Sequence, residues 1–224
     1  ETDALLALEE ACRAQGRALR SARGCRPLGT CLAAAVTGLV SAGVLLWWGD
    51  GVLDLLAAGA LSTPLVADEG QWWRLFATML LHGGWVHLLM NLSAIVPVGI
   101  LLERRIGTAR WVIVYVGSGF AGSLASVYVN HTDVGVGASG AAMGLIGALL
   151  LVLLRRPALF PSAERARWVF LLWACVAATA AIGLIEHRYV DNAAHAAGLL
   201  AGAALALPIL PPRSARLGAS PGRL

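Results

Sequence analysis

The sequence contains no lysine, and charged residues of any kind are scarce. All 17 basic residues are arginine, and charged residues make up 13% of the 224 residues, whereas hydrophobic residues make up 58%. Soluble globular domains are typically about 25% charged and about 45–50% apolar. The composition therefore excludes an ordinary soluble domain of this size and favours a protein whose outer surface faces lipid.

Charge is absent altogether from six long apolar stretches, which contain no Asp, Glu, Lys or Arg. A helix needs about 20 mostly apolar residues to cross the hydrocarbon core, and each stretch is close to that length. None shows the period-two alternation of a transmembrane strand. The sequence therefore predicts an all-α membrane protein in which six transmembrane helices form a bundle. The predicted spans are residues 29–49, 83–102, 111–130, 134–154, 168–185 and 192–210.

The positions of the arginines predict the orientation of the bundle. All except Arg74 and Arg188 lie before span one, in the second or fourth connection, or after span six. Because arginine accumulates on the cytoplasmic side of membrane proteins, both termini are predicted to be cytoplasmic. This gives a tail over 1–28, a six-helix domain over 29–211 and a second tail over 212–224. The net charge of +4 follows from this topology, so we infer no nucleic-acid partner.

The connection between spans one and two, residues 50–82, is long and partly apolar. Asp54 and Pro64 interrupt its apolar part, and Trp72 and Trp73 follow. Tryptophan is enriched where a membrane meets water. The pattern predicts a long first loop that is partly embedded in the membrane.

Disulfide and metal-site patterns are also missing. Two of the four cysteines precede span one, while Cys31 and Cys175 lie inside spans, where cysteine usually serves as a small packing residue. His82 and His87 are five residues apart and so off a common helical face, and no cysteine or carboxylate joins them in the pattern of a zinc site. We expect neither a metal nor a cofactor.

Polar side chains inside a membrane are costly, so each needs a packing or a functional explanation. One group is interpreted as packing residues whose hydroxyls bond locally: Ser93, Ser118, Ser123, Ser126 and Thr179. A second group lies a few residues inside the outer ends of spans two, four and six: His87, Asn91, Ser139 and His195. At 1.5 Å rise per residue these four lie roughly 5–12 Å deep, in one layer that water can reach.

This layer contains the groups that acyl transfer requires. Glycines at helical spacing accompany Ser139 on span four and His195 on span six, and such stripes let two helices approach closely. The His195 imidazole could then act as general base toward the Ser139 hydroxyl. Donors to the developing oxyanion could come from His87, Asn91 and the Ser139 backbone N–H. The glycines are Gly140, Gly144, Gly147, Gly198 and Gly202.

Each of these residues also has a simpler interpretation. A lone serine or asparagine in a span is usually a packing residue. Asp191, four residues before His195, would complete a triad if it oriented the imidazole, but "VDNAAH" at a helix start favours Asp191 or Asn192 as an N-cap. We favour the cap. The joint pattern is the stronger signal because three separate helices bring complementary groups to one depth.

Four motifs occur in order along the chain: "WR" at Trp73–Arg74, "HGGWVHLLMN" at His82–Asn91, "GASG" at Gly137–Gly140 and "AHAAGLLAG" at Ala194–Gly202. Together they resemble the rhomboid family of intramembrane serine proteases, in its basic six-helix bacterial form, over about residues 70–210.

The resemblance implies a dyad without a carboxylate, with Ser139 as nucleophile and His195 as base. It implies that His87 and Asn91 help to form the oxyanion hole, and that His82, Trp73 and Arg74 are structural. One departure concerns Met143, because some family members carry an aromatic residue there, one turn after the serine, that packs on the catalytic histidine. A thioether contact would be softer.

The expected function is therefore that of an intramembrane serine endopeptidase in a bacterial inner membrane, with its active site open to the extracytoplasmic side. The resemblance implies membrane-anchored substrates, such as single-pass proteins, cut within or beside their transmembrane helix. Two alternatives stay open. An inactive family member would bind membrane clients without cutting them, but both Ser139 and His195 are present here. A small transporter is less compatible with spans that contain no charged residue.

Overall fold

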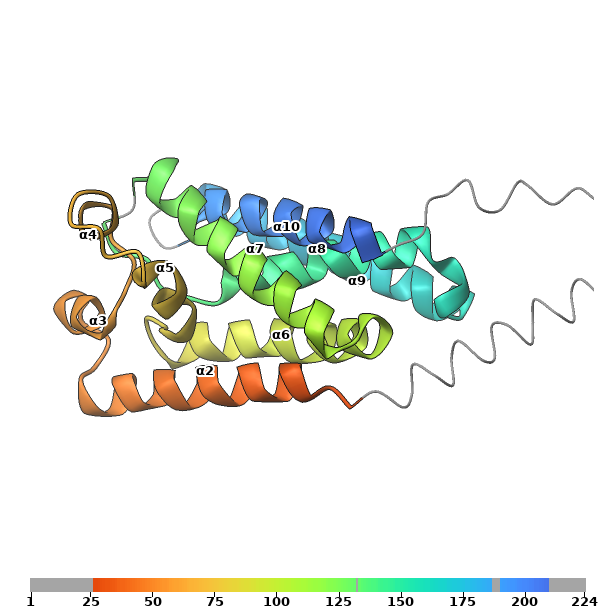
Figure 1. The fold of residues 1–224 in the computed structure, drawn as a ribbon, viewed down its shortest axis with the longest axis horizontal. Coiled ribbons are helices and arrows are strands. Elements are labelled where there is room, and N and C mark those ends of the chain that lie inside the picture. The colour runs from red at the N-terminus through yellow and green to blue at the C-terminus, as the bar shows by residue number, and fades with distance from the viewer. Residues whose placement is uncertain (1–25, 132, 187–189, 210–224) are drawn as a thin grey trace, which may run out of the picture.

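The computed structural model describes residues 26–131, 133–186 and 190–209, and those residues form a bundle of helices (Figure 1). Within them the only extended pairing is a single bridge between Leu61 and Gly135. The long helices are α2 (Leu28–Trp47), α6 (Trp85–Ile106), α7 (Thr108–Tyr128), α8 (Ser139–Arg155), α9 (Ser162–Ile185) and α10 (Asn192–Ala206). The predicted tails lie almost entirely outside the described residues.

The prediction of an all-helical membrane protein is confirmed. Among the described helices, α2, α6, α7 and α9 are long and apolar enough to cross a membrane, and α8 and α10 are shorter apolar helices. The first and last described residues lie at the same end of the bundle (Figure 1). That six helices cross the bilayer, with both termini in the cytoplasm, stays a prediction.

Helix α8 begins at Ser139, five residues later than the expected start at Val134. Gly135 exchanges two backbone hydrogen bonds with Leu61, at 2.8 and 2.9 Å, and Gly137 has a φ of +127°. Both features require non-helical backbone. Ser139 is therefore the first residue of its helix, and the depth estimated for it from a helix beginning at Val134 does not apply.

Helix α6 extends to Ile106 and so includes the carboxylate of Glu103, which is completely buried. One carboxylate oxygen accepts from the Gly29 N–H at 2.8 Å and from Thr108 Oγ1 at 2.7 Å. The other accepts from the N–H and the hydroxyl of Thr30, at 2.8 and 2.7 Å. The first turn of α2 has no side-chain cap of its own, so Glu103 supplies it from another helix and ties together the ends of α2, α6 and α7.

The first connection folds into α3 (Val52–Ala58), α4 (Thr63–Ala67), α5 (Arg74–Ala77) and the 3₁₀ turn η1 (Thr78–Leu80), at the end of the bundle opposite the first and last described residues (Figure 1). Arg74 holds these pieces together. Its guanidinium donates to the carbonyls of Leu56 and Ala60, both at 2.8 Å, and stacks 4.7 Å from the Trp73 ring. Burial lowers the pKa of Arg74.

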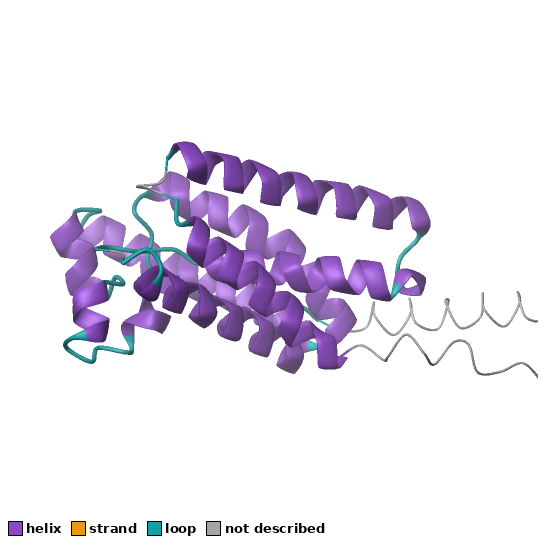
Figure 2. Cartoon of the chain, turned by 90° about the horizontal axis from the view of Figure 1, so that it is seen from above, coloured by secondary structure: helices purple, strands orange, loops and turns teal. Residues whose placement is uncertain are grey.

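Helices α7, α8 and α10 form the tightly packed centre, whereas α9 lies at the edge. Of the most apolar part of α9, only 11% is buried. Figure 2 shows this helix along the outer side of the bundle. Cys31 and Cys175 lie within α2 and α9, inside the predicted spans, and both are exposed, so neither serves as a packing residue between helices.

Candidate active site

Ser139 lies at the start of α8 with its side chain partly exposed. The preceding residue, Ala138, offers no side-chain cap, and the first N–H groups of any helix lack intrahelical acceptors. The segment before Ser139 is anchored to η1, because the Gly137 N–H donates to the Thr78 carbonyl at 3.0 Å and the Thr78 hydroxyl donates to the Gly135 carbonyl at 2.7 Å. The first loop therefore holds the backbone that presents the serine.

Gly137 lies beside the ring of His87 on α6 and close to the Ser139 hydroxyl. A Cβ at Gly137 would lie 2.9 Å from His87 Nε2 and 3.8 Å from Ser139 Oγ. The His87 ring and the Ser139 hydroxyl therefore both lie close to Gly137. Any larger residue at position 137 would have to displace the histidine ring, so glycine is required both for its φ and for space.

Asn91, one turn after His87, is 5% exposed. Its side-chain amide donates to the His87 backbone carbonyl at 3.1 Å. An amide nitrogen carries two hydrogens, so one bond to the helix leaves a second N–H for another acceptor.

His195 lies in the first turn of α10 and is 8% exposed. Within the described residues, its Nδ1 has no hydrogen-bond partner, and no hydrogen bond joins its ring to Ser139. Catalytic hydrogen bonds are often long before substrate binds, so this geometry does not remove His195 as a candidate base.

The glycines of α8 and α10 bring the backbones of these helices into direct contact. A Cβ at Gly198 would overlap the Gly140 carbonyl oxygen, and a Cβ at Gly202 would overlap that of Gly144. A Cβ at Gly147 would overlap the carbonyl of Leu199 on α10. Since Gly140 follows Ser139 directly and Gly198 is one turn from His195, the contact lies beside the candidate dyad.

Asp191 is the N-cap of α10, as favoured from the sequence. Its carboxylate accepts from the Ala194 N–H at 2.8 Å and also from the side chains of Ser126, near the end of α7, and Asn130, just after it. The interpretation of Ser126 as a locally bonded packing residue is therefore wrong, because its hydroxyl reaches another helix. Ser118 and Ser93 do bond within their own helices, to Val114 O and Met90 O.

His82 lies just before α6 and is 1% exposed. Its ring packs edge-on against His87, with centroids 4.9 Å apart, and its Nδ1 lies 2.8 Å from Ser41 Oγ on α2. Burial, with a smaller contribution from His87, lowers the pKa of His82 to about 3, so the ring is neutral near pH 7. Met143 is buried in the core one turn after Ser139.

The sequence interpretation missed Ser41 and Thr78. Ser41 had a signal, because Thr30, Thr37 and Ser41 recur at helical spacing and form most of the buried face of α2. Thr78 lies in an irregular segment and had no such signal. In the described part of the chain, no group of three or more His, Cys, Asp or Glu residues is placed to hold a metal ion.

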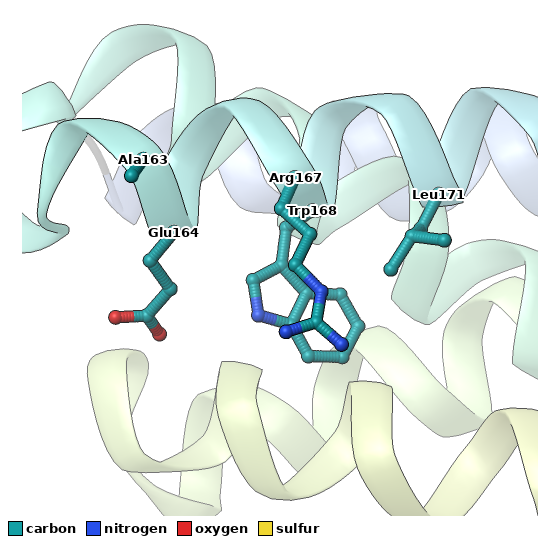
Figure 3. A pocket seen from close by; sticks show the side chains of 5 residues that line it. All are labelled: Ala163, Glu164, Arg167, Trp168 and Leu171. Atoms are coloured by element: carbon teal, nitrogen blue, oxygen red, sulfur yellow. The ribbon is translucent and has the colours of Figure 1, made fainter.

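A cavity of about 380 Å³ opens beside the first turns of α9, lined by Ala163, Glu164, Arg167, Trp168 and Leu171 (Figure 3). Helix α9 begins shortly after α8 ends, so this cavity lies near Arg155, at the opposite end of α8 from Ser139. A helix of 17 residues is about 25 Å long. None of the candidate site residues lines the cavity.

Comparison with known proteins is consistent with this geometry. Residues 69–212 match the family model described as the Rhomboid domain. The chain is 40% identical over 152 residues to RHOMBOID-like protein 6, mitochondrial, from Arabidopsis thaliana, covering 68% of this chain and 48% of the relative. It is 36% identical over 158 residues to Rhomboid protease GluP from Bacillus subtilis, covering 69% of this chain and 30% of the relative.

A third relative is RHOMBOID-like protein 1 of Arabidopsis thaliana, 38% identical over 154 residues, with 69% of this chain and 39% of the relative covered. The chain thus spans about half or less of the length of these relatives. The matched region contains the first-loop motif, the start of α6, the start of α8 and all of α10. This multi-pass helical membrane protein belongs to the rhomboid family.

Proposed function

We propose that the chain is an intramembrane serine endopeptidase that cleaves membrane-anchored proteins in or beside a transmembrane helix. The observation that carries this proposal is the start of α8. There a partly exposed serine stands at an uncapped helix N-terminus, and the His87 ring lies beside Gly137, two residues before it. One relative, Rhomboid protease GluP, is named as a protease, which supports the same chemistry.

In this mechanism Ser139 Oγ attacks the scissile carbonyl and His195 accepts the hydroxyl proton. The oxyanion that forms receives hydrogen bonds from the Ser139 N–H, His87 and the free N–H of Asn91. His195 then returns the proton to the leaving amine, and water hydrolyses the acyl-enzyme. Asp191 caps α10, and His195 Nδ1 has no hydrogen-bond partner among the described residues, so the base in this mechanism works without a hydrogen-bonded carboxylate.

The site lies at the end of the bundle formed by the first loop, because Thr78 is hydrogen-bonded to the segment that leads into Ser139. Arginines of the described chain lie mainly at the other end, where α6 is followed by α7 and α8 by α9. The positive-inside rule therefore supports an active site that opens on the extracytoplasmic side.

Labelling with a fluorophosphonate tests the proposal without knowledge of the natural substrate. Such reagents react with activated serines, so wild-type protein should be labelled and Ser139→Ala should not. Asn91→Ala should label more slowly by about 10²–10³-fold, as for loss of one oxyanion donor. Ser93→Ala is a matched control on α6, because its hydroxyl only bonds its own helix.

Equal labelling of wild type and Ser139→Ala, together with no cleavage of membrane-anchored peptides, would exclude the protease. Binding of such peptides without cleavage would then favour an inactive family member that holds membrane clients.

A further inference from the structure

The ring of His82 is held by a hydrogen-bonded chain that begins on α2. Ser41 Oγ lies 2.7 Å from the Leu80 carbonyl and 2.8 Å from His82 Nδ1. A hydroxyl has one hydrogen, and a carbonyl can only accept. Ser41 therefore donates to Leu80 and accepts from His82, which places the imidazole hydrogen on Nδ1 and fixes both the tautomer and the ring orientation.

The His87 ring packs against the ring of His82. Within the described residues the His87 ring makes no hydrogen bond, and its packing partner is the His82 ring, 4.9 Å away at 71°. Its Nε2 and Cε1 lie against Gly137, where an added Cβ would be 2.9 and 3.0 Å from them and 3.8 Å from Ser139 Oγ. A ring without hydrogen bonds can tilt unless its neighbour is fixed.

The Ser41 hydroxyl bonds a distant segment of the chain and not a carbonyl of its own helix. A serine inside a helix can donate to the carbonyl four residues earlier, as Ser118 does to Val114 at 2.6 Å. Ser41 instead bonds across 39 positions of sequence to the turn that carries His82, and it is completely buried there. A serine that only filled space between helices could bond within α2 and would not need the bond to Leu80.

We propose that Ser41 is a positioning residue that acts through His82 to orient His87 toward the oxyanion. The inference rests on the proposed function, since it assigns a role within the same site. It extends the site to α2, a helix that contributes no residue to the dyad or the oxyanion hole.

The test compares Ser41→Ala with Thr37→Val. Thr37 lies one turn earlier on α2 and is 1% exposed, and in the described part of the chain its hydroxyl is not bonded to His82 or to the turn that carries it. Both changes remove a buried hydroxyl, but only the first frees His82. Ser41→Ala should lower the limiting rate of Ser139 labelling by about 3–30-fold, because sub-ångström misplacement of a reacting group is costly. The affinity of Ser41→Ala for the reagent should be unchanged. Thr37→Val should be labelled at the wild-type rate.

The decisive arm repeats Ser41→Ala in a His87→Ala background. If Ser41 acts through His87, the second change adds no further loss, whereas independent effects would multiply. An equal loss in both backgrounds overturns the inference, and so does equal slowing by Thr37→Val. Absence of Ser139 labelling in the wild type overturns the proposed function itself. Failure of the Ser41 inference alone leaves the wild-type labelling intact, so the two failures are distinguishable.

Imidazole nitrogen NMR of ¹⁵N-histidine-labelled wild-type protein tests the Ser41–His82 bond directly, before any variant is compared. We expect the His82 resonances to report hydrogen on Nδ1, and a comparison with Ser41→Ala to show loss of that fixed tautomer. Hydrogen on Nε2 of His82 in the wild type would overturn the proposed chain.

Discussion

Replacing Gly198 with alanine tests whether the contact between α8 and α10 sets the geometry of the candidate dyad. A Cβ at Gly198 would overlap the Gly140 carbonyl oxygen and lie 2.9 and 3.0 Å from the Gly140 carbonyl carbon and Cα. These are backbone atoms of another helix, so no side-chain rotation relieves the overlap. The two helices have to separate.

The required separation follows from ordinary packing distances. Carbon atoms pack at about 3.5–4.0 Å and the Gly140 oxygen would lie closer than either carbon, so α8 and α10 must move apart by about 1 Å at this level. Gly140 adjoins Ser139, and Gly198 is three residues from His195, so nearly all of this displacement reaches the dyad. A shift of about 1 Å can cost about 10²-fold in rate. Overpacking of this kind costs about 1–3 kcal/mol of stability.

We therefore expect Gly198→Ala to slow fluorophosphonate labelling of Ser139 by about 10–10²-fold and to lower the free energy of unfolding in mixed micelles. Gly43→Ala on α2 is the matched control, because an added Cβ there meets nothing within 4 Å. That variant should label normally and be slightly more stable, since alanine favours helix by about 1 kcal/mol. Normal labelling by Gly198→Ala would refute the reasoning.

Three further predictions concern side chains around the site and at the far end of the bundle. Asp191→Asn should keep the cap of α10 and retain labelling within about 3-fold, whereas a triad member would lose about 10⁴-fold in turnover. Glu103→Gln should destabilise the protein by about 2–4 kcal/mol in an unfolding titration, because the amide nitrogen would face buried donors, while labelling of the folded fraction stays normal. His82→Asn should reduce acid sensitivity: a folded pKa of about 3 against an ordinary 6.5 means that the unfolded chain takes up the proton first, so the wild type loses stability as pH falls through this window. Between pH 7.5 and 5 the free energy of unfolding of the wild type should fall by about 2 kcal/mol through this group, and that of His82→Asn should not. An equal fall in both proteins would contradict the burial of His82.

The sequence predicted the helices well where hydropathy alone decides them. It failed at the start of α8, because the pairing of Gly135 with Leu61 overrides the apolar pattern of residues 134–138. Leu61 is 74 positions earlier in the chain, and nothing near Val134 signals it. The failure matters for the site, since it places Ser139 at the helix N-terminus, where the helix leaves its N–H without an acceptor.

Buried polar groups show the same limit. A carboxylate or hydroxyl inside a membrane protein must be bonded, so its presence in the sequence indicates that a partner exists. The partner itself is set by tertiary packing. Ser126 bonds Asp191, Glu103 caps α2 and Ser41 holds His82, each across tens of residues.

The sequence by itself determined the class of protein, the helical stretches and the set of candidate residues, because transfer into lipid and short motifs are local properties of the chain. Only the tertiary structure decided how these residues meet: that Ser139 begins its helix, that Gly137 leaves room for the His87 ring, and that α2 reaches the site through Ser41. These features depend on contacts between distant segments, and each requires the neighbouring helices to be in place before it can form.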